Sequence, residues 1–308
     1  MTEDELKIIA ANLSALTDEA SSVMERRFAH LYGLARALGG GELSDAKRGE
    51  YTRLVDEVET PGRSSGQEGD FSRLLLRADR ISLCSFIYEN LGGRHGPPSP
   101  EELLGIEAPP DEDVPNRVCY LHNFFTDKAF SIFADALEGL TVSYAPDFTG
   151  VCEEVYYSRA KYCILPTENS ADGMLSGFRA LVGKYELNYV LTCDVLAQDG
   201  ESFTRFALLH RGIMQPPTVL GERVFEFTAS FDPGGATLPD VLDAASSFGL
   251  VLRHINMLPA SFSGRSGMFD LAFTYGDMEK LAKFLVFLSL ELPQFEALGL
   301  YTHLSSGE

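Results

Sequence analysis

The hydrophobic pattern changes its period once along the chain, and this change limits the folds that the sequence can adopt. Up to about residue 93, apolar residues recur at steps of three and four, the spacing of one face of an α-helix. Beyond residue 116, short β-rich runs alternate with helical segments, which is typical of an α/β fold. The sequence therefore predicts a multidomain protein that is helical first and α/β afterwards.

Glycine and proline residues mark the predicted boundaries. The glycines at 39–41 end a first long helix, residues 60–66 end a second, and residues 71–91 form a third. Prolines recur among acidic residues over 94–116, a composition that predicts a linker. We therefore expect a helical domain over residues 1–93, followed by this linker.

Two further segments follow the linker. Residues 117–214 alternate strands with helices and predict one α/β lobe, in which Ser170 caps a helix over 171–184. Residues 222–306 are expected to run strand, helix, strand, strand, helix, strand, the βαββαβ order of a ferredoxin-like fold.

Composition narrows the partners and the compartment. A net charge of −20 repels nucleic acid and anionic lipid, so small molecules or other proteins are the expected partners. No apolar run approaches the roughly 18 residues of a membrane span, and the acidic N-terminus lacks a secretory signal, so we expect a cytoplasmic protein. The five cysteines lack CxxC spacing and the six histidines lack metal-ligand spacing, so we expect no disulfide framework, metal or cofactor.

One strand-to-helix turn carries the strongest chemical signal. Residues 165–173 read Leu-Pro-Thr-Glu-Asn-Ser-Ala-Asp-Gly, and a helix that began at Ser170 would present free N–H groups able to hold a carboxylate. The alternative interpretation is an ordinary capped helix.

This segment, followed by Thr-Arg-Phe at 204–206, resembles the two signatures of the prephenate dehydratases, in the same order. The resemblance implies a periplasmic-binding-protein-like lobe and an enzyme of phenylalanine biosynthesis, a lyase that converts prephenate to phenylpyruvate with loss of carbon dioxide and water. It implies proton donation by Thr204, carboxylate binding by Arg205, and substrate contacts from Glu168, Asn169, Ser170 and Thr126.

The resemblance extends to both ends of the chain. Residues 222–306 resemble the ACT regulatory domain that binds phenylalanine in this family, which implies a regulatory site at Gly235, Ala236, Leu238 and Asn256. The N-terminal helices resemble the chorismate mutase domain of the bifunctional P-protein, which implies a mutase-like site at Arg26, Arg48 and Asp45. Solvated arginines on an amphipathic helix are the alternative for that second site.

Three departures from the family leave its activity open. The glycine-rich loop after the first strand is replaced at 120–128, where only Thr126 is kept. The second lobe of the family is replaced by the nine residues 195–203. In the mutase-like helices, Ile9 and Ala37 stand where that family has an arginine and a lysine.

Three hypotheses remain open. The first is a prephenate dehydratase whose cleft is completed across an oligomer interface, and the second is a non-catalytic regulatory homologue that binds an aromatic ligand or a partner enzyme. The third is a residual chorismate mutase. The expected ligands are prephenate, chorismate or phenylalanine, and a homodimer or a higher homo-oligomer is expected because related domains bury apolar faces between subunits.

Overall fold

A computed structural model describes residues 3–59, 77–92, 96–106, 114–231, 235–258 and 267–304. The chain divides into two compact units, one of residues 1–98 with 285–290 and one of residues 99–284 with 291–308, named here the helical unit and the sheet unit. Within the described ranges, none of the helices has both the length and the apolar character that crossing a membrane requires.

The helical unit contains α1 (Glu3–Ala37), α2 (Asp45–Glu59) and α3 (Arg77–Asn90). The end of α1 is where the glycines predict it, and Gly39 adopts a φ of 71° there. The ammonium group of Lys47 donates to the carbonyl oxygens of Gly39 and Gly40 at 2.7 and 2.9 Å, so a cation satisfies acceptors at this helix end. Residues 60–76, which include the start predicted for the third helix, lie outside the described residues.

The remaining elements belong to the sheet unit, except that residues 285–290 of α9 fall in the helical unit. The helices are α4 (Pro100–Leu103), α5 (Phe124–Ala136), α6 (Phe148–Tyr156), α7 (Ser176–Lys184), α8 (Leu238–Ser247) and α9 (Met278–Glu291). The strands are β1 (Arg117–Tyr120), β2 (Thr141–Tyr144), β3 (Tyr162–Asn169), β4 (Gly173–Met174), β5 (Leu187–Leu196), β6 (Phe203–Arg211), β7 (Glu222–Ser230), β8 (Val251–Leu258), β9 (Met268–Thr274) and β10 (Glu296–Leu304). The short helix α4 lies within the predicted linker.

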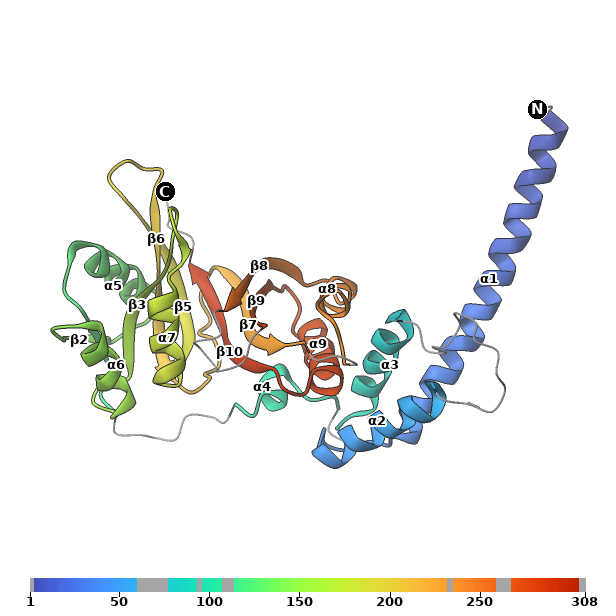
Figure 1. Ribbon diagram of the computed structural model, residues 1–308, viewed down its shortest axis with the longest axis horizontal. Helices are drawn as coiled ribbons and strands as arrows, with labels where there is room; N and C mark the ends of the chain where they lie inside the picture. The colour runs from blue at the N-terminus through green and yellow to red at the C-terminus, as the bar shows by residue number, and fades with distance from the viewer. Residues whose placement is uncertain are drawn as a thin grey trace. The chain divides into compact units, whose positions relative to one another are not determined.

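The strands form one continuous sheet in the order β2-β1-β3-β6-β5-β10-β7-β9-β8, with β4 paired to β3 (Figure 1). Strand β1 is parallel to β2 and β3, whereas β6 runs antiparallel between β3 and β5. Strand β10 is parallel to β5 and antiparallel to β7. The mixed α/β prediction is confirmed. The strands of the two predicted domains, 117–214 and 222–306, share this sheet through the β5–β10 pair, and the division into domains stays a prediction.

Strands β5 and β6 form a hairpin over the segment where the family resemblance implies a second lobe. They pair antiparallel from Leu187 opposite Arg211 to Leu196 opposite Phe203. The side chain of Asp199 closes the turn by accepting the N–H groups of residues 201 and 202 at 3.0 and 2.9 Å. The residues described between β5 and β6 thus form a turn with no core of its own.

The helix predicted over 171–184 is wrong in its first turn. Helix α7 begins only at Ser176, and the chain before it folds back as a β3–β4 hairpin in which Asn169 pairs with Gly173. The Asn169 side chain accepts N–H groups from residues 171 and 172 at 2.9 and 2.6 Å, and Gly173 takes a φ of 69°. Asn, Asp and Gly favour such turns over a helix start.

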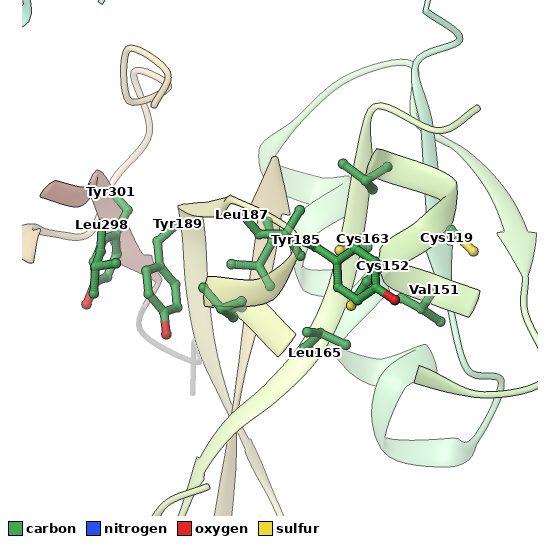
Figure 2. Close-up of a cluster of buried hydrophobic side chains, with 14 of the residues drawn as sticks. Cys119, Val151, Cys152, Cys163, Leu165, Tyr185, Leu187, Tyr189, Leu298 and Tyr301 are labelled. Atoms are coloured by element: carbon green, nitrogen blue, oxygen red, sulfur yellow. The ribbon is translucent and has the colours of Figure 1, made fainter. Parts of the chain in front are cut away.

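Helices cover both faces of the sheet. Helices α6 and α7 pack on one face against a cluster that crosses the β5–β10 pair, where the rings of Tyr189 and Tyr301 lie 5.2 Å apart (Figure 2). Helix α5 packs on the other face through Phe133. In the C-terminal half, Phe284 of α9 packs edge-on against Phe225 of β7. Side chains alternate between the two faces along a strand, so Val224 and Glu226, which flank Phe225 in β7, point toward the opposite face, the one that carries α7.

Candidate functional site

A cluster of charged side chains lies on the α7 face of the sheet, and Arg205 is its first member. In the strand register Arg205 lies opposite both Asp194 of β5 and Glu168 of β3. Its Nε and Nη2 donate to the two carboxylate oxygens of Asp194 at 2.8 and 3.0 Å, and its Nη1 donates to Glu168. Cross-strand pairing thus places the guanidinium between two carboxylates of the protein itself.

The charge of Arg205 is therefore compensated inside the sheet. Burial works against this charge, but the hydrogen bond and the charge of Asp194, together with Glu168, raise the pKa of the guanidinium above its usual value. Only 16% of the Arg205 side chain is exposed. A ligand carboxylate would have to displace one of these two partners to reach it.

Thr204 and Arg205, the two predicted catalytic residues, project from opposite faces of the sheet. Strand β6 pairs regularly with β5 here, whereas on the β3 side the register shifts between Pro166 and Glu168. Along β6 itself the next two residues, Phe206 and Ala207, belong to the core clusters of opposite faces. Thr204 lies opposite Asn169 of β3. The structure therefore brings Thr204 near Asn169 and Arg205 near Glu168, on separate faces.

The predicted substrate contacts at the turn have local structural roles. Asn169 holds the turn described above, and its amide group also donates to Asp172 at 3.0 Å. The Ser170 hydroxyl accepts the N–H of Phe203 at 3.2 Å, so it bonds to β6 and does not cap a helix. No helix N-terminus lies at Ser170 to hold a carboxylate.

Thr126, the remaining predicted substrate contact, is buried at the start of α5. Its hydroxyl donates to the carbonyl oxygen of Leu121 at 2.7 Å and accepts the N–H of Asn123 at 3.1 Å. Its N–H in turn donates to the Asn123 side chain, which completes a capping box. With 1% of the residue exposed, this hydroxyl is committed to the helix cap.

The second half of the charged cluster lies on β7, β8 and β9. Arg179 of α7 donates through Nε to Asp270 Oδ2 at 3.2 Å, and both side chains are buried. The Tyr301 hydroxyl donates to Glu226 Oε2 at 2.5 Å. His254 Nε2 lies 4.0 Å from the other Asp270 oxygen, Oδ1. Two buried carboxylates and one imidazole thus meet on this face.

Burial sets the proton affinities of these groups. It raises the pKa of Glu226 well above the usual value, and the charge of Asp270 adds to this effect. Burial also lowers the pKa of His254, although the charge of Asp270 opposes that shift. Each of these two groups therefore favours its neutral form.

His303 of β10 links the two halves of the cluster. Its Nδ1 lies 3.0 Å from the Thr192 hydroxyl, and its Nε2 lies 3.7 Å from Asp194 Oδ2. Burial and the nearby charges of Arg253 and Arg205 lower the pKa of His303 to about 4, against the opposing effect of Asp194. The imidazole is therefore neutral near neutral pH.

These side chains make up what we call the polar cluster: Glu168, Arg179, Asp194, Arg205, Glu226, His254, Asp270, Tyr301 and His303. Six of its nine members line a cavity of about 30 Å³, enough for one water molecule or one ion. The cluster holds two more carboxylates than guanidinium groups. Its chemistry favours a cation over an anionic metabolite.

The four predicted regulatory residues do not line one common cavity in the structure. Asn256 lies opposite Asp270 in the β8–β9 register and lines the same cavity. Gly235 is exposed and Ala236 buried at the start of α8, beside the half-buried Leu238, and none of the three lines that cavity.

The predicted mutase-like residues make only local contacts within the helical unit. Arg26 is exposed and donates to a carbonyl oxygen of its own helix at 3.4 Å. Arg48 pairs with Asp45 at 2.7 Å, and 95% of the Asp45 side chain is exposed. The neighbouring Arg27 instead pairs with the buried Asp79 and joins α1 to α3.

A larger groove of about 960 Å³ lies at the other end of β3, β5 and β6. Lys161, Glu186 and Arg211 are among its charged lining residues. Arg211 pairs with Glu186 at 3.3 Å. None of the predicted site residues lines this groove.

Comparison with known proteins shows a similarity of fold to solved structures. No protein-family model and no curated protein matches the chain. The structure is similar to that of a prephenate dehydratase from Streptococcus mutans, with a TM-score of 0.50 and 20% identity over 61% of this chain and 98% of that one.

Two weaker similarities accompany it. GqqA, described as a novel type of quorum quenching acylase, has a TM-score of 0.47 and 22% identity over 61% of this chain and 95% of its own. A prephenate dehydratase from Arthrobacter aurescens in complex with L-Phe has a TM-score of 0.46 and 16% identity over 60% of this chain and 90% of its own. The fold thus resembles that of the Streptococcus mutans enzyme, and this likeness by itself assigns no activity.

Proposed function

We propose that this protein is a non-catalytic homologue of prephenate dehydratase that acts as a regulatory protein of aromatic amino acid biosynthesis. The observation that carries the proposal is the pairing of Arg205 with Glu168 and Asp194. Prephenate presents two carboxylates, and in this lobe the arginine expected to bind one of them is already neutralised by the protein. Breaking that compensation would leave a partly buried carboxylate without its cation.

Two further features favour binding over catalysis. Thr204 and Arg205 face opposite sides of the sheet, so one ligand on one face cannot use both. The β5–β6 hairpin replaces the lobe that would form the other wall of a cleft. Without that wall, water is not excluded from a reacting ligand.

The regulatory part of the proposal rests on the C-terminal half. Its element order β7-α8-β8-β9-α9-β10 and its strand order β10-β7-β9-β8 are those of a ferredoxin-like unit, which suits an ACT-type domain. Met257 and Leu258 stand where the motif of that family has polar residues, so we expect phenylalanine to bind weakly at best.

We also propose that the protein is a cytoplasmic homodimer. Along α1, Ile9, Leu13, Leu16 and Val23 follow one helical face and are 47%, 60%, 61% and 46% exposed. An apolar stripe of this length is suited to a second copy of the same helix.

The dehydratase hypothesis keeps one supporting observation. Thr204 lies opposite Asn169 at the ends of two paired strands, and both residues are partly exposed. A neighbouring subunit over this edge could supply the missing wall.

Releasing Arg205 from its partners tests the proposal. In the Glu168→Gln/Asp194→Asn variant the guanidinium loses both charged partners but keeps neighbours of the same shape. A freed guanidinium gains a charge-assisted hydrogen bond of about 1.5–3 kcal/mol to a ligand carboxylate. We therefore expect calorimetric titration to show prephenate affinity at least about tenfold higher than that of the unmodified protein.

The control is Asp199→Asn, which removes an exposed carboxylate from the β5–β6 turn and leaves Arg205 paired. Circular dichroism would check the fold of each variant. Saturable prephenate binding by the unmodified protein that is lost in Arg205→Met would contradict the proposal, because it would show that Arg205 is available to the substrate.

A further inference from the structure

Glu226, His254 and Asp270 form a compact set of metal-ligand side chains on three neighbouring strands. One ligand atom from each lies within 4.8 Å of the corresponding atoms of the other two. Bonds of about 2.0–2.2 Å to a first-row metal would hold ligand atoms at most about 4.4 Å apart. Side-chain movements of a few tenths of an ångström would therefore close this set around an ion.

An unsatisfied buried oxygen points to a ligand at the same place. Asp270 is 1% exposed, and its Oδ1 has no hydrogen-bond partner among the described residues while Glu226 is ionised; only a protonated Glu226 carboxyl could donate to this carboxylate. This carboxylate lines the cavity of about 30 Å³, together with Glu226 and His254. A buried carboxylate oxygen without a partner is costly, and a bound cation removes that cost.

The opposite oxygens of both carboxylates are held by other residues. Arg179 donates to Asp270 Oδ2 at 3.2 Å, and the Tyr301 hydroxyl donates to Glu226 Oε2 at 2.5 Å. Partners of this kind orient ligands in metal sites and contribute to metal affinity. Arg179 adds a positive charge, but the polar cluster still holds two more carboxyl groups than guanidinium groups, so a divalent ion that displaces the proton of Glu226 would bring it to neutrality.

We propose that Glu226, His254 and Asp270 bind one divalent transition-metal ion per chain. One imidazole with two carboxylates suits zinc, manganese or iron(II) better than magnesium or calcium, which take oxygen ligands. The cavity holds an ion but not an aromatic metabolite, so the site is independent of whether the lobe binds prephenate.

Calorimetric titration of the full chain with Zn²⁺, after treatment with a chelator, tests this proposal. We expect one zinc ion per chain and an affinity at least tenfold lower in both His254→Gln and Glu226→Gln. His254 lies 4.0 Å from Asp270 but favours its neutral form, so His254→Gln removes no ion pair. Gln also keeps the size of Glu, and two independent variants guard against a folding defect.

The matched control is His122→Gln. His122 lies 3.0 Å from a carboxylate oxygen of Asp127 but on an exposed loop, so it reports adventitious binding to a surface imidazole and carboxylate. The affinity of this control should equal that of the unmodified protein. Absence of saturable binding at one equivalent, or an equal loss in the control and in the two site variants, would overturn the proposal.

Discussion

At the scale of single residues, the polar cluster is governed by charge compensation. Arg205 is held by two carboxylates and Arg179 by one, and all of these groups lie on one face of the sheet. Buried charges are stable only when they are paired and hydrogen-bonded. The lowered pKa of His303 follows from the same environment, and it predicts how the stability of the protein depends on pH.

We predict that His303 makes the protein less stable as the pH falls from 6.5 to about 4. The folded state keeps the imidazole neutral down to about pH 4, because of burial and the charges of Arg253 and Arg205. In the unfolded chain the imidazole takes up a proton near the ordinary histidine pKa of 6.5. Acid therefore favours unfolding, and the free energy of unfolding falls by up to about 3 kcal/mol by pH 4. Urea unfolding across this pH range measures the slope.

The difference between the unmodified protein and His303→Asn isolates this contribution, because an amide at the Nδ1 position can still bond to Thr192. The variant should show a shallower slope between pH 6.5 and 4, in which the buried His254 still contributes, whereas His122→Asn, at an exposed site, should keep the slope of the unmodified protein. A slope that His303→Asn leaves unchanged would show that another group takes up the proton.

The sequence identifies only part of this cluster. Glu168 and Arg205 stand out because they belong to a recognisable motif. Asp194, Glu226 and Asp270 are separated by tens of residues and meet only through strand pairing, so their local spacing carries no sign of a site. The sequence likewise predicts no metal role for His254, because ligand spacing along the chain reports only local sites, whereas the proposed metal site draws on three strands.

At the scale of elements, hydrophobic periodicity predicts most helices and strands, since each buries a face of fixed period. It fails at the start of α7, where the turn preferences of Asn169 and Gly173 outweigh the helical pattern. It also gives no indication that β10 pairs with β5. That pairing depends on a close backbone approach at Gly299, which only glycine allows.

We predict that Gly299→Ala weakens the β5–β10 pair. A Cβ there would lie 2.7 Å from the carbonyl oxygen of Tyr189 and 3.2 Å from its amide nitrogen. Relieving such a clash between two backbones should lower the free energy of unfolding by about 1–3 kcal/mol. Urea denaturation measures the loss, and hydrogen exchange at Leu191 and Thr302 would locate it.

Gly177→Ala is the matched control. A Cβ at Gly177, in the first turn of α7, meets no atom within 4 Å. Alanine is the better helix former by up to about 1 kcal/mol, so this variant should be as stable as the unmodified protein or more so. Equal stability of the two alanine variants would show that β10 does not depend on a glycine at this position.

At the scale of the whole molecule, the structure resembles that of a prephenate dehydratase, and one sheet joins the strands of residues 117–214 to those of residues 222–306. The motifs that suggest an enzyme are present, but their side chains stabilise this sheet and its turns. Arg205 pairs with its neighbours, Thr126 caps α5 and Asn169 closes a turn. The mixed α/β fold could be predicted from sequence, whereas these contacts depend on tertiary packing.

The central claim is that these residues do not catalyse. The most direct test is the formation of phenylpyruvate from prephenate at neutral pH by the purified protein, with Thr204→Ala and a protein-free reaction measured beside it. The predicted result is that all three form phenylpyruvate at the same, uncatalysed rate. Turnover by the unmodified protein that disappears in Thr204→Ala would contradict the account and establish the chain as a prephenate dehydratase.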